Sequence, residues 1–84
     1  MTAIYRYEVP VDDLRHRHVL HGDPLGVGLR KPEVVEFWAV SDGPPKERSF
    51  LVVGTGHPLP YDMQHHWGFA YDGPFVWHLI EVAA

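Results

Sequence analysis

The sequence predicts an all-β fold: a small antiparallel sandwich or partly open barrel of about six to seven short strands, with at most one short helical turn. Three observations predict it. Eight Gly and eight Pro interrupt the 84 residues too often for long helices. The segments between these breaks are rich in β-branched and aromatic residues, which favour strands. Two of the breaks contain Asp-Gly pairs, which favour tight turns between antiparallel strands.

The predicted strands lie mostly between such breaks. In chain order the strands cover residues 3–9, 14–20, 25–30, 34–41, 48–54, 67–71 and 75–82. The segment His21-Gly22-Asp23-Pro24 turns the chain into the third strand, and Lys31-Pro32-Glu33 turns it into the fourth.

The two Asp-Gly pairs predict hairpins. Asp42-Gly43, within residues 41–46, is expected to close an antiparallel pair between the fourth and fifth strands. Asp72-Gly73, followed by Pro74, is expected to do the same between the sixth and seventh. Together these turns predict a meander-like antiparallel sheet.

Residues 54–64 do not fit a strand, because Gly and Pro recur without an alternating pattern. We expect a loop, with a short helical turn at residues 61–65 as an alternative. Irregular loops of this length are often functional or are held by their own side chains.

Three of the predicted strands are apolar on both faces: residues 34–41, 48–54 and 75–82. One small sheet covers only one face, so the pattern predicts a barrel, a sandwich or a second subunit. A domain of 84 residues without disulfides is often stabilised further by association. We therefore expect a homo-oligomer, and a dimer is the commonest kind.

Composition excludes several classes of protein. The net charge of −4 argues against a nucleic-acid-binding surface, and the absence of Cys excludes disulfides and thiolate sites. No segment reaches the roughly 20 apolar residues of a membrane-spanning helix. We expect one cytoplasmic domain covering residues 1–84.

The seven His residues raise the question of a metal site. His16 and His18 are two apart on a predicted strand and so share a face, a spacing that metal ligands use, but a third ligand is not evident. The alternative is a solvated strand whose charges protect a sheet edge. His65 and His66 would point apart on an extended chain. We expect no cofactor.

Conventional catalytic patterns are absent from the sequence. Ser41 and Ser49 do not lie in a nucleophile elbow, and no Cys nucleophile exists. We therefore expect a binding protein instead of an enzyme, with no catalytic residues assigned.

The segment Gly54-Thr55-Gly56-His57 admits two interpretations. Its amide groups, with the Thr55 hydroxyl and the His57 ring, are able to form an anion-binding nest. Alternatively, the two glycines serve only the backbone geometry of a strand exit. His78, inside an apolar strand, is expected to be a core His hydrogen-bonded to the backbone, with a ligand or interface role as the alternative.

Five segments resemble a domain-of-unknown-function family of short phage and bacterial proteins: residues 4–8, 37–40, 52–58, 67–69 and 76–81. The block Gly-Thr-Gly-His-Pro in residues 54–58 is the most specific of them. The His-rich segment 15–21 departs from the family pattern. The resemblance implies a phage accessory protein that acts in the host cytoplasm.

These observations predict a non-enzymatic, homo-oligomeric accessory protein that binds or sequesters a host protein or a small anionic, nucleotide-like ligand, as in counter-defence. The expected ligand-binding residues are Gly54, Thr55, Gly56 and His57, with Arg15, Arg17 and Trp67 as charge and stacking partners.

Two other functions stay open. One is a metal-dependent hydrolase that uses His16 and His18 with His57 or His78. The other is a structural or virion-associated component.

Overall fold

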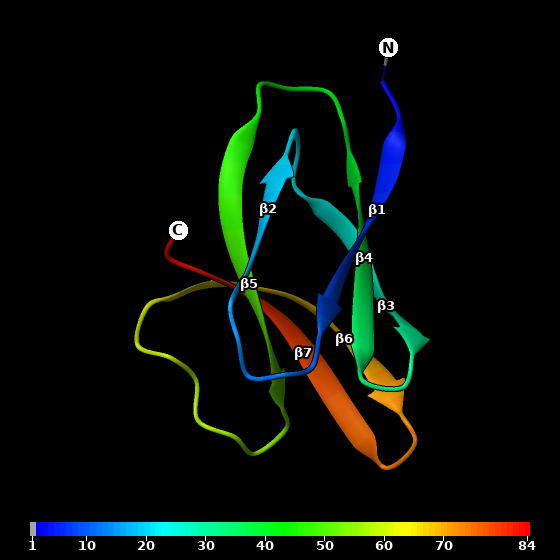
Figure 1. Cartoon of the computed structure of the whole chain (residues 1–84), viewed down its shortest axis with the longest axis vertical. Coiled ribbons are helices and arrows are strands. Elements are labelled where there is room, and N and C mark those ends of the chain that lie inside the picture. The colour runs from blue at the N-terminus through cyan, green and yellow to red at the C-terminus, as the bar shows by residue number, and fades with distance from the viewer. Residues whose placement is uncertain (1) are drawn as a thin grey trace.

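Seven antiparallel strands form two sheets in the computed structural model, which describes residues 2–84 (Figure 1). One sheet has the order β1-β4-β3 and the other β2-β5-β7-β6. The strands are β1 (Ile4–Pro10), β2 (His16–Leu20), β3 (Pro24–Lys31), β4 (Val34–Val40), β5 (Lys46–Gly54), β6 (Met63–Asp72) and β7 (Phe75–Val82). Residues 2–84 contain no helix and the sheets do not close into a barrel, so the predicted sandwich is confirmed.

One predicted hairpin, at Asp72-Gly73, is present, and the predicted turn at residues 31–33 also closes an antiparallel pair. Antiparallel β3 and β4 are joined by the turn at Pro32 and Glu33, and β6 and β7 by the turn at Gly73 and Pro74. Both turns contain a residue with positive φ, Glu33 at 65° and Gly73 at 56°. The local turn chemistry therefore determines these two pairings.

The predicted hairpin at Asp42-Gly43 is wrong, and so is the simple meander. Residues 41–45 instead cross from one sheet to the other, as the green arch at the top of Figure 1 shows. Strand β4 is already paired with β1 on one edge and β3 on the other, so it has no free edge for β5. Strand β5 pairs with β2 and β7.

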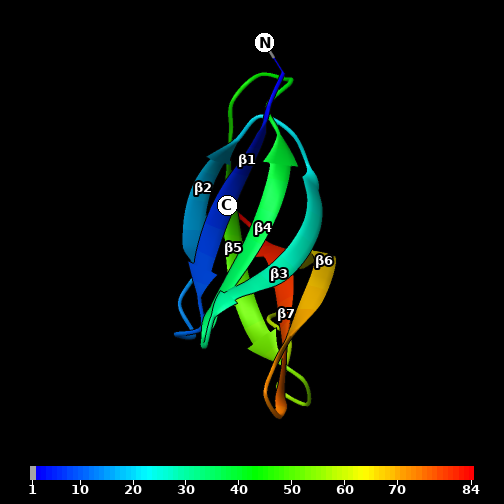
Figure 2. The same ribbon diagram turned by 90° about the vertical axis from the view of Figure 1, so that its right-hand side faces the viewer.

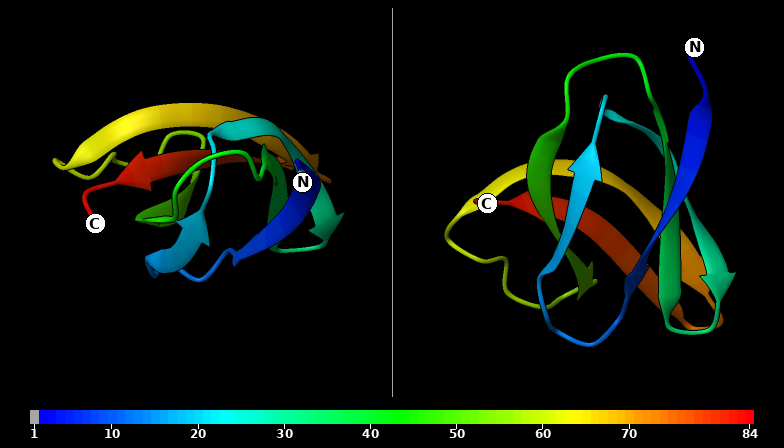
Figure 3. Two further views of the ribbon diagram at one scale, coloured as in Figure 1. Left: turned by 90° about the horizontal axis from the view of Figure 1, so that it is seen from above. Right: turned by 45° about the horizontal axis from the view of Figure 1, so that its top comes forward.

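Strand β6 begins at Met63, four residues before the predicted start at residue 67. Met63 pairs with Val82 and His65 with Glu81, so residues 61–65 do not form a helical turn. The loop between β5 and β6 is therefore limited to residues 55–62, and Figure 3 shows it projecting beside the second sheet as it runs from the end of β5 to the start of β6.

The main core lies between the two sheets, which Figure 2 shows one in front of the other. Phe37 of β4 and Phe50 of β5 meet at its centre with ring centroids 4.9 Å apart. The buried side chains of this core are Val9, Leu20, Val35, Phe37, Phe50, Val52 and Leu79.

A second cluster lies on the outer face of the second sheet. Val53, Ile80 and Val82 are buried there against Leu51 and Met63. The loop 55–62 runs beside this cluster, since its residues line the same hollows as Val53. The apolar pattern on both faces of β5 and β7 is thus satisfied largely within one chain.

Candidate functional site

The segment Gly54–His57 is a tight turn at the end of β5. The Thr55 amide donates to the Val76 carbonyl (3.2 Å) and the His57 amide donates to the Gly54 carbonyl (3.1 Å). Gly56 has φ +89°, a conformation that favours glycine. Two of the amides that an anion nest would use are therefore engaged within the protein.

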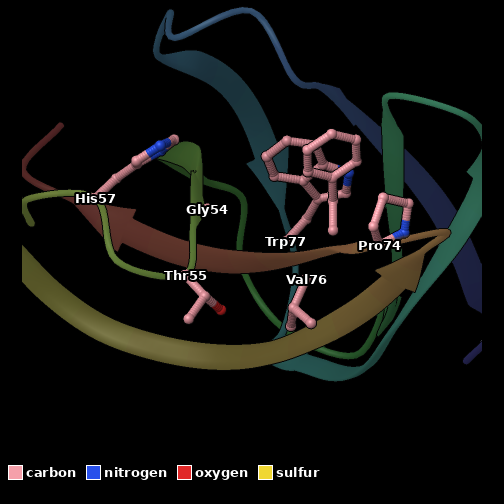
Figure 4. A pocket seen from close by; sticks show the side chains of 7 residues that line it. Gly54, Thr55, His57, Pro74, Val76 and Trp77 are labelled. Carbon is pink, nitrogen blue, oxygen red and sulfur yellow. The ribbon is translucent and has the colours of Figure 1, made fainter.

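A hollow of about 470 Å³ opens on this turn, and we call it the aromatic hollow (Figure 4). The rings of Phe75 and Trp77 stack beside it, with centroids 5.3 Å apart and planes 15° from parallel. Phe75 is 55% exposed although it is a large apolar side chain. The residues that line the hollow are Gly54, Thr55, His57, Pro74, Phe75, Val76 and Trp77.

Gly54 allows the walls of the aromatic hollow to approach each other. A Cβ atom at this position would lie 3.1 Å from both His57 Nδ1 and Trp77 Cζ3. Figure 4 shows His57 and Trp77 on one side of β7, whereas Thr55 and Val76 point to the other side. The turn therefore presents different side chains to the two faces of the sheet.

Asp72 holds Trp77 in place. Its Oδ2 atom accepts hydrogen bonds from Trp77 Nε1 (2.9 Å) and from the Glu33 amide (2.9 Å). The indole N–H, followed by this amide, lowers the pKa of Asp72 below its ordinary value. One carboxylate thus joins the two hairpin turns and fixes the ring on which Phe75 stacks.

A second hollow, of about 310 Å³, opens on the other side of the turn, and we call it the histidine hollow. His78 is half-buried there, with Nε2 2.7 Å from Thr55 Oγ1 and Nδ1 2.9 Å from His66 Nε2. The lining residues are Val53, Gly54, Thr55, Gly56, His57, Leu59, His66 and His78. The predicted core histidine with a backbone partner is wrong, because both ring nitrogens of His78 meet side chains.

His66 is a site residue that sequence reasoning missed. His65 and His66 do point apart: the His65 ring lies 4.0 Å from Trp67, whereas His66 meets His78. The sequence would reveal this pair only if it predicted that the sixth strand begins before residue 66 and how that strand is aligned with β7.

The predicted partners of the turn lie elsewhere. Arg17 pairs with Glu47 (2.8 Å) on the exposed edge of the second sheet. Arg15 pairs with Asp62 at the far end of the loop 55–62. Trp67 faces the space between the sheets.

Trp67 belongs to a buried polar network. Its Nε1 atom donates to Glu81 Oε1 (3.0 Å), and the Arg48 guanidinium lies 5.6 Å from its ring centroid. It therefore packs against the main core and does not line either hollow.

The histidines considered as metal ligands are not gathered into one site. His16 Nε2 lies 2.8 Å from Asp12 Oδ1, and His18 Nε2 lies 3.0 Å from the Glu8 carbonyl oxygen. Within residues 2–84, no group of three His, Cys, Asp or Glu side chains is placed to hold a metal ion. The hydrolase that would use His16 and His18 with His57 or His78 therefore lacks a three-ligand site in this part of the chain.

Comparison with known proteins identifies the family. Residues 1–84 match the family model described as Domain of unknown function (DUF7352). The chain belongs to this family. No curated protein and no solved structure matches it.

The family description names no activity, and the two hollows are the features of the fold that bear on function. As for membranes, the part of the chain from Thr2 to Ala84 includes no helix of the length and apolarity needed to span one.

Proposed function

We propose that this DUF7352 chain is a homo-oligomeric binding protein, without enzymatic activity, that takes up a planar, nucleotide-like ligand in the aromatic hollow. The observation that carries the proposal is the stacked pair of Phe75 and Trp77 beside the turn Gly54–His57. Trp77 is fixed by Asp72, and the Phe75 ring is left exposed to a flat ligand.

The size and chemistry of the hollow suit such a ligand. Its volume of about 470 Å³ lies within the range of roughly 300–1,000 Å³ that is typical of small-molecule sites. Stacking of a base on an aromatic side chain contributes about 1–3 kcal/mol and tolerates different bases. The His57 ring lies at the rim and supplies a polar contact.

The ligand's ring is expected to contribute more to binding than any phosphate group. Arg15 and Arg17 are paired with carboxylates away from the hollow, and the Thr55 and His57 amides donate within the protein. We therefore propose that a nucleoside and its monophosphate bind with affinities within about tenfold of each other, a difference of about 1.4 kcal/mol or less.

Association of chains is part of this proposal. Apart from Phe75, several large apolar side chains are exposed to solvent, and such side chains mark an interaction surface where they gather into one patch. They include Ile4, Tyr5, Leu25, Leu59, Tyr61, Phe69 and Tyr71. We propose that a second copy covers part of this set.

The biological role that we propose follows from the resemblance to short phage and bacterial proteins. A small protein that sequesters a nucleotide-like signal in the host cytoplasm would counter a defence that depends on that signal. A host protein that inserts an aromatic side chain into the hollow is the competing occupant.

The proposal is tested by thermal denaturation with a panel of nucleobases, nucleosides and nucleotides, with inorganic phosphate as the control. A ligand at 100 times its Kd stabilises the folded state by about 2.7 kcal/mol, which raises Tm by about 10–20 °C in a domain of this size. Stabilisation by a nucleoside but not by phosphate supports the proposal. No shift with any member of the panel, or a shift with phosphate alone, contradicts it.

A further inference from the structure

We infer that His66 and His78 form a second site, which binds one divalent transition-metal ion in the histidine hollow. Neither histidine lines the aromatic hollow, and the site does not depend on the proposed ligand. Imidazole nitrogens are good ligands for copper, nickel and zinc. Here two of them face each other at 2.9 Å.

The spacing of the two nitrogens allows one ion to bind both of them from one side of the line that joins them. With metal–nitrogen bonds of roughly 2.0–2.1 Å, nitrogens at this spacing subtend an angle of about 90° at the ion. That angle corresponds to adjacent positions in square-planar or tetragonal coordination, which copper(II) and nickel(II) prefer. Tetrahedral zinc requires a nitrogen separation of about 3.3 Å, so zinc fits less well without movement of His66.

A β-bulge brings His66 to the same face as His78. Phe69 pairs with His78 and Gly68 with Leu79, but the next pair is His66 with Ile80, so one residue of β6 is left over. Without the bulge, strict alternation over the three positions from His66 to Phe69 would place these two side chains on opposite faces. Bulges are frequent beside functional sites, where they redirect a side chain.

Thr55 orients His78 for metal binding. In the tautomer that donates from Nε2 to Thr55 Oγ1, at 2.7 Å, the Nδ1 atom of His78 keeps a free lone pair toward His66. Thr55 is itself anchored to β7 by the hydrogen bond that its backbone amide donates to the Val76 carbonyl oxygen. When the ion binds, neutral His66 carries its proton on Nδ1 and offers Nε2, so the ion replaces the hydrogen bond between the rings.

The surroundings leave room for further ligands. His66 is exposed, so water molecules are able to complete the coordination from the solvent side. Leu59 and Val53 line the hollow without competing charges. By contrast, His16 is held by Asp12 and His18 by the Glu8 carbonyl oxygen.

The site is tested by titrating the tag-free chain with copper(II) in isothermal titration calorimetry, followed by electron paramagnetic resonance of the complex. We expect one copper ion per chain, with spectral splitting from two imidazole nitrogens. His66→Ala is expected to weaken copper binding by at least about tenfold, and Thr55→Val to weaken it by about 10- to 100-fold through loss of the orienting bond.

His65→Ala is the matched control, because His65 is the neighbouring exposed histidine and its ring lies against Trp67 instead. Its copper affinity should equal that of the unaltered chain. Circular dichroism confirms that each variant is folded before titration. Equal affinities of the His66→Ala and His65→Ala variants, or a spectrum with fewer than two nitrogen ligands, would overturn the site. Neither result affects nucleoside binding, so this test and that of the proposed function fail separately.

Discussion

Arg48 and Glu81 form a two-point ion pair between the sheets. The Arg48 Nε and Nη2 atoms donate to the two oxygens of Glu81 at 2.9 and 2.7 Å, and both residues are at least nine-tenths buried. Asp23 Oδ1 accepts from Arg48 Nη1 (2.9 Å), and Trp67 completes the set by donating to Glu81. Such a pair stabilises the fold only while every member is present, because a buried charge without its partner is costly.

The substitution Glu81→Gln is therefore expected to lower the free energy of unfolding by about 3 kcal/mol, as measured by urea denaturation. Glu47→Gln is the matched control, because Glu47 pairs with Arg17 at 2.8 Å but both side chains are more than half exposed. It should cost less than about 1 kcal/mol. Equal losses in the two variants would contradict the role assigned to the buried pair.

The same pair predicts acid sensitivity. Burial by itself would raise the pKa of Glu81, but the hydrogen bonds from Arg48 and Trp67 outweigh it and hold the pKa below the ordinary value of 4.5. A lowered pKa in the folded state stabilises the protein above the unfolded value, and this stabilisation is lost as the pH falls through the folded value. The pKa of Asp72 is lowered by its hydrogen bonds from Trp77 and Glu33. Its contribution to stability is therefore also lost on acidification, as the pH falls below 3.8.

We therefore expect the free energy of unfolding to fall steadily below about pH 4.5, when urea unfolding is followed from about pH 6 to about pH 3. In the Glu81→Gln variant the free energy of unfolding should fall less steeply with decreasing pH. Its fall should begin at the lower pH where Asp72 becomes protonated, below about pH 3.8. An identical pH dependence in both proteins would show that Glu81 is not the main acid-sensitive group.

At the scale of elements, the two hairpin turns differ in how well their residues suit the backbone. Gly73 at φ 56° is the residue type that this conformation favours, whereas Glu33 adopts φ 65° with a full side chain. Glu33 binds Asp72 through its backbone amide and not through its side chain, so a glycine at this position would keep the hydrogen bond.

Glu33→Gly is therefore expected to stabilise the protein by about 0.5–1 kcal/mol, and Gly73→Ala to destabilise it by about 1 kcal/mol, both measured by chemical denaturation. The opposite signs form an internal control, because both positions lie in exposed hairpin turns. A loss of stability in Glu33→Gly would mean that its side chain contributes more than its backbone strain costs.

These elements also show which features the sequence was able to predict. The turns at 31–33 and 72–74 depend only on neighbouring residues, so local chemistry predicts both of them. The link at 41–45 was misread because β4 is already paired on both edges, which no local pattern reveals.

The histidine pair was missed for a similar reason. His66 reaches His78 only through a bulge in β6 and the register of that strand with β7. Trp67 was predicted at the site from its aromatic character, yet the fold turns it toward the buried Glu81. Side-chain type is visible in a sequence, whereas the face that a bulged strand presents is not.

For the whole molecule, the structure changes the argument for association. Most apolar residues on both faces of β5 and β7 are covered within the chain, so the case for a second copy now depends on exposed side chains. Phe69 and Tyr71 lie on β6, an edge strand, with their rings 5.6 Å apart and Tyr71 70% exposed. They form a small apolar surface on an edge strand of the second sheet.

We expect light scattering coupled to size-exclusion chromatography to give the mass of a dimer at micromolar concentration. Tyr71→Glu should shift the chain toward the monomer, because it places a charge in the covered surface. Tyr61→Glu, at a fully exposed position in the loop, should leave the mass unchanged. A monomer for the unaltered chain would remove association from the proposal.

The aromatic hollow is the central claim, and one comparison of affinities tests it most directly. Phe75→Ala and Phe69→Ala remove the same side chain at similar exposure, 55% and 48%, but on opposite faces of the second sheet. The measurement is the affinity of the most stabilising nucleoside for each variant by isothermal titration calorimetry. Stacking on Phe75 predicts a loss of about 1–3 kcal/mol, about 5- to 150-fold in Kd, for Phe75→Ala and no change for Phe69→Ala. Equal affinities for the two variants would contradict binding in the aromatic hollow.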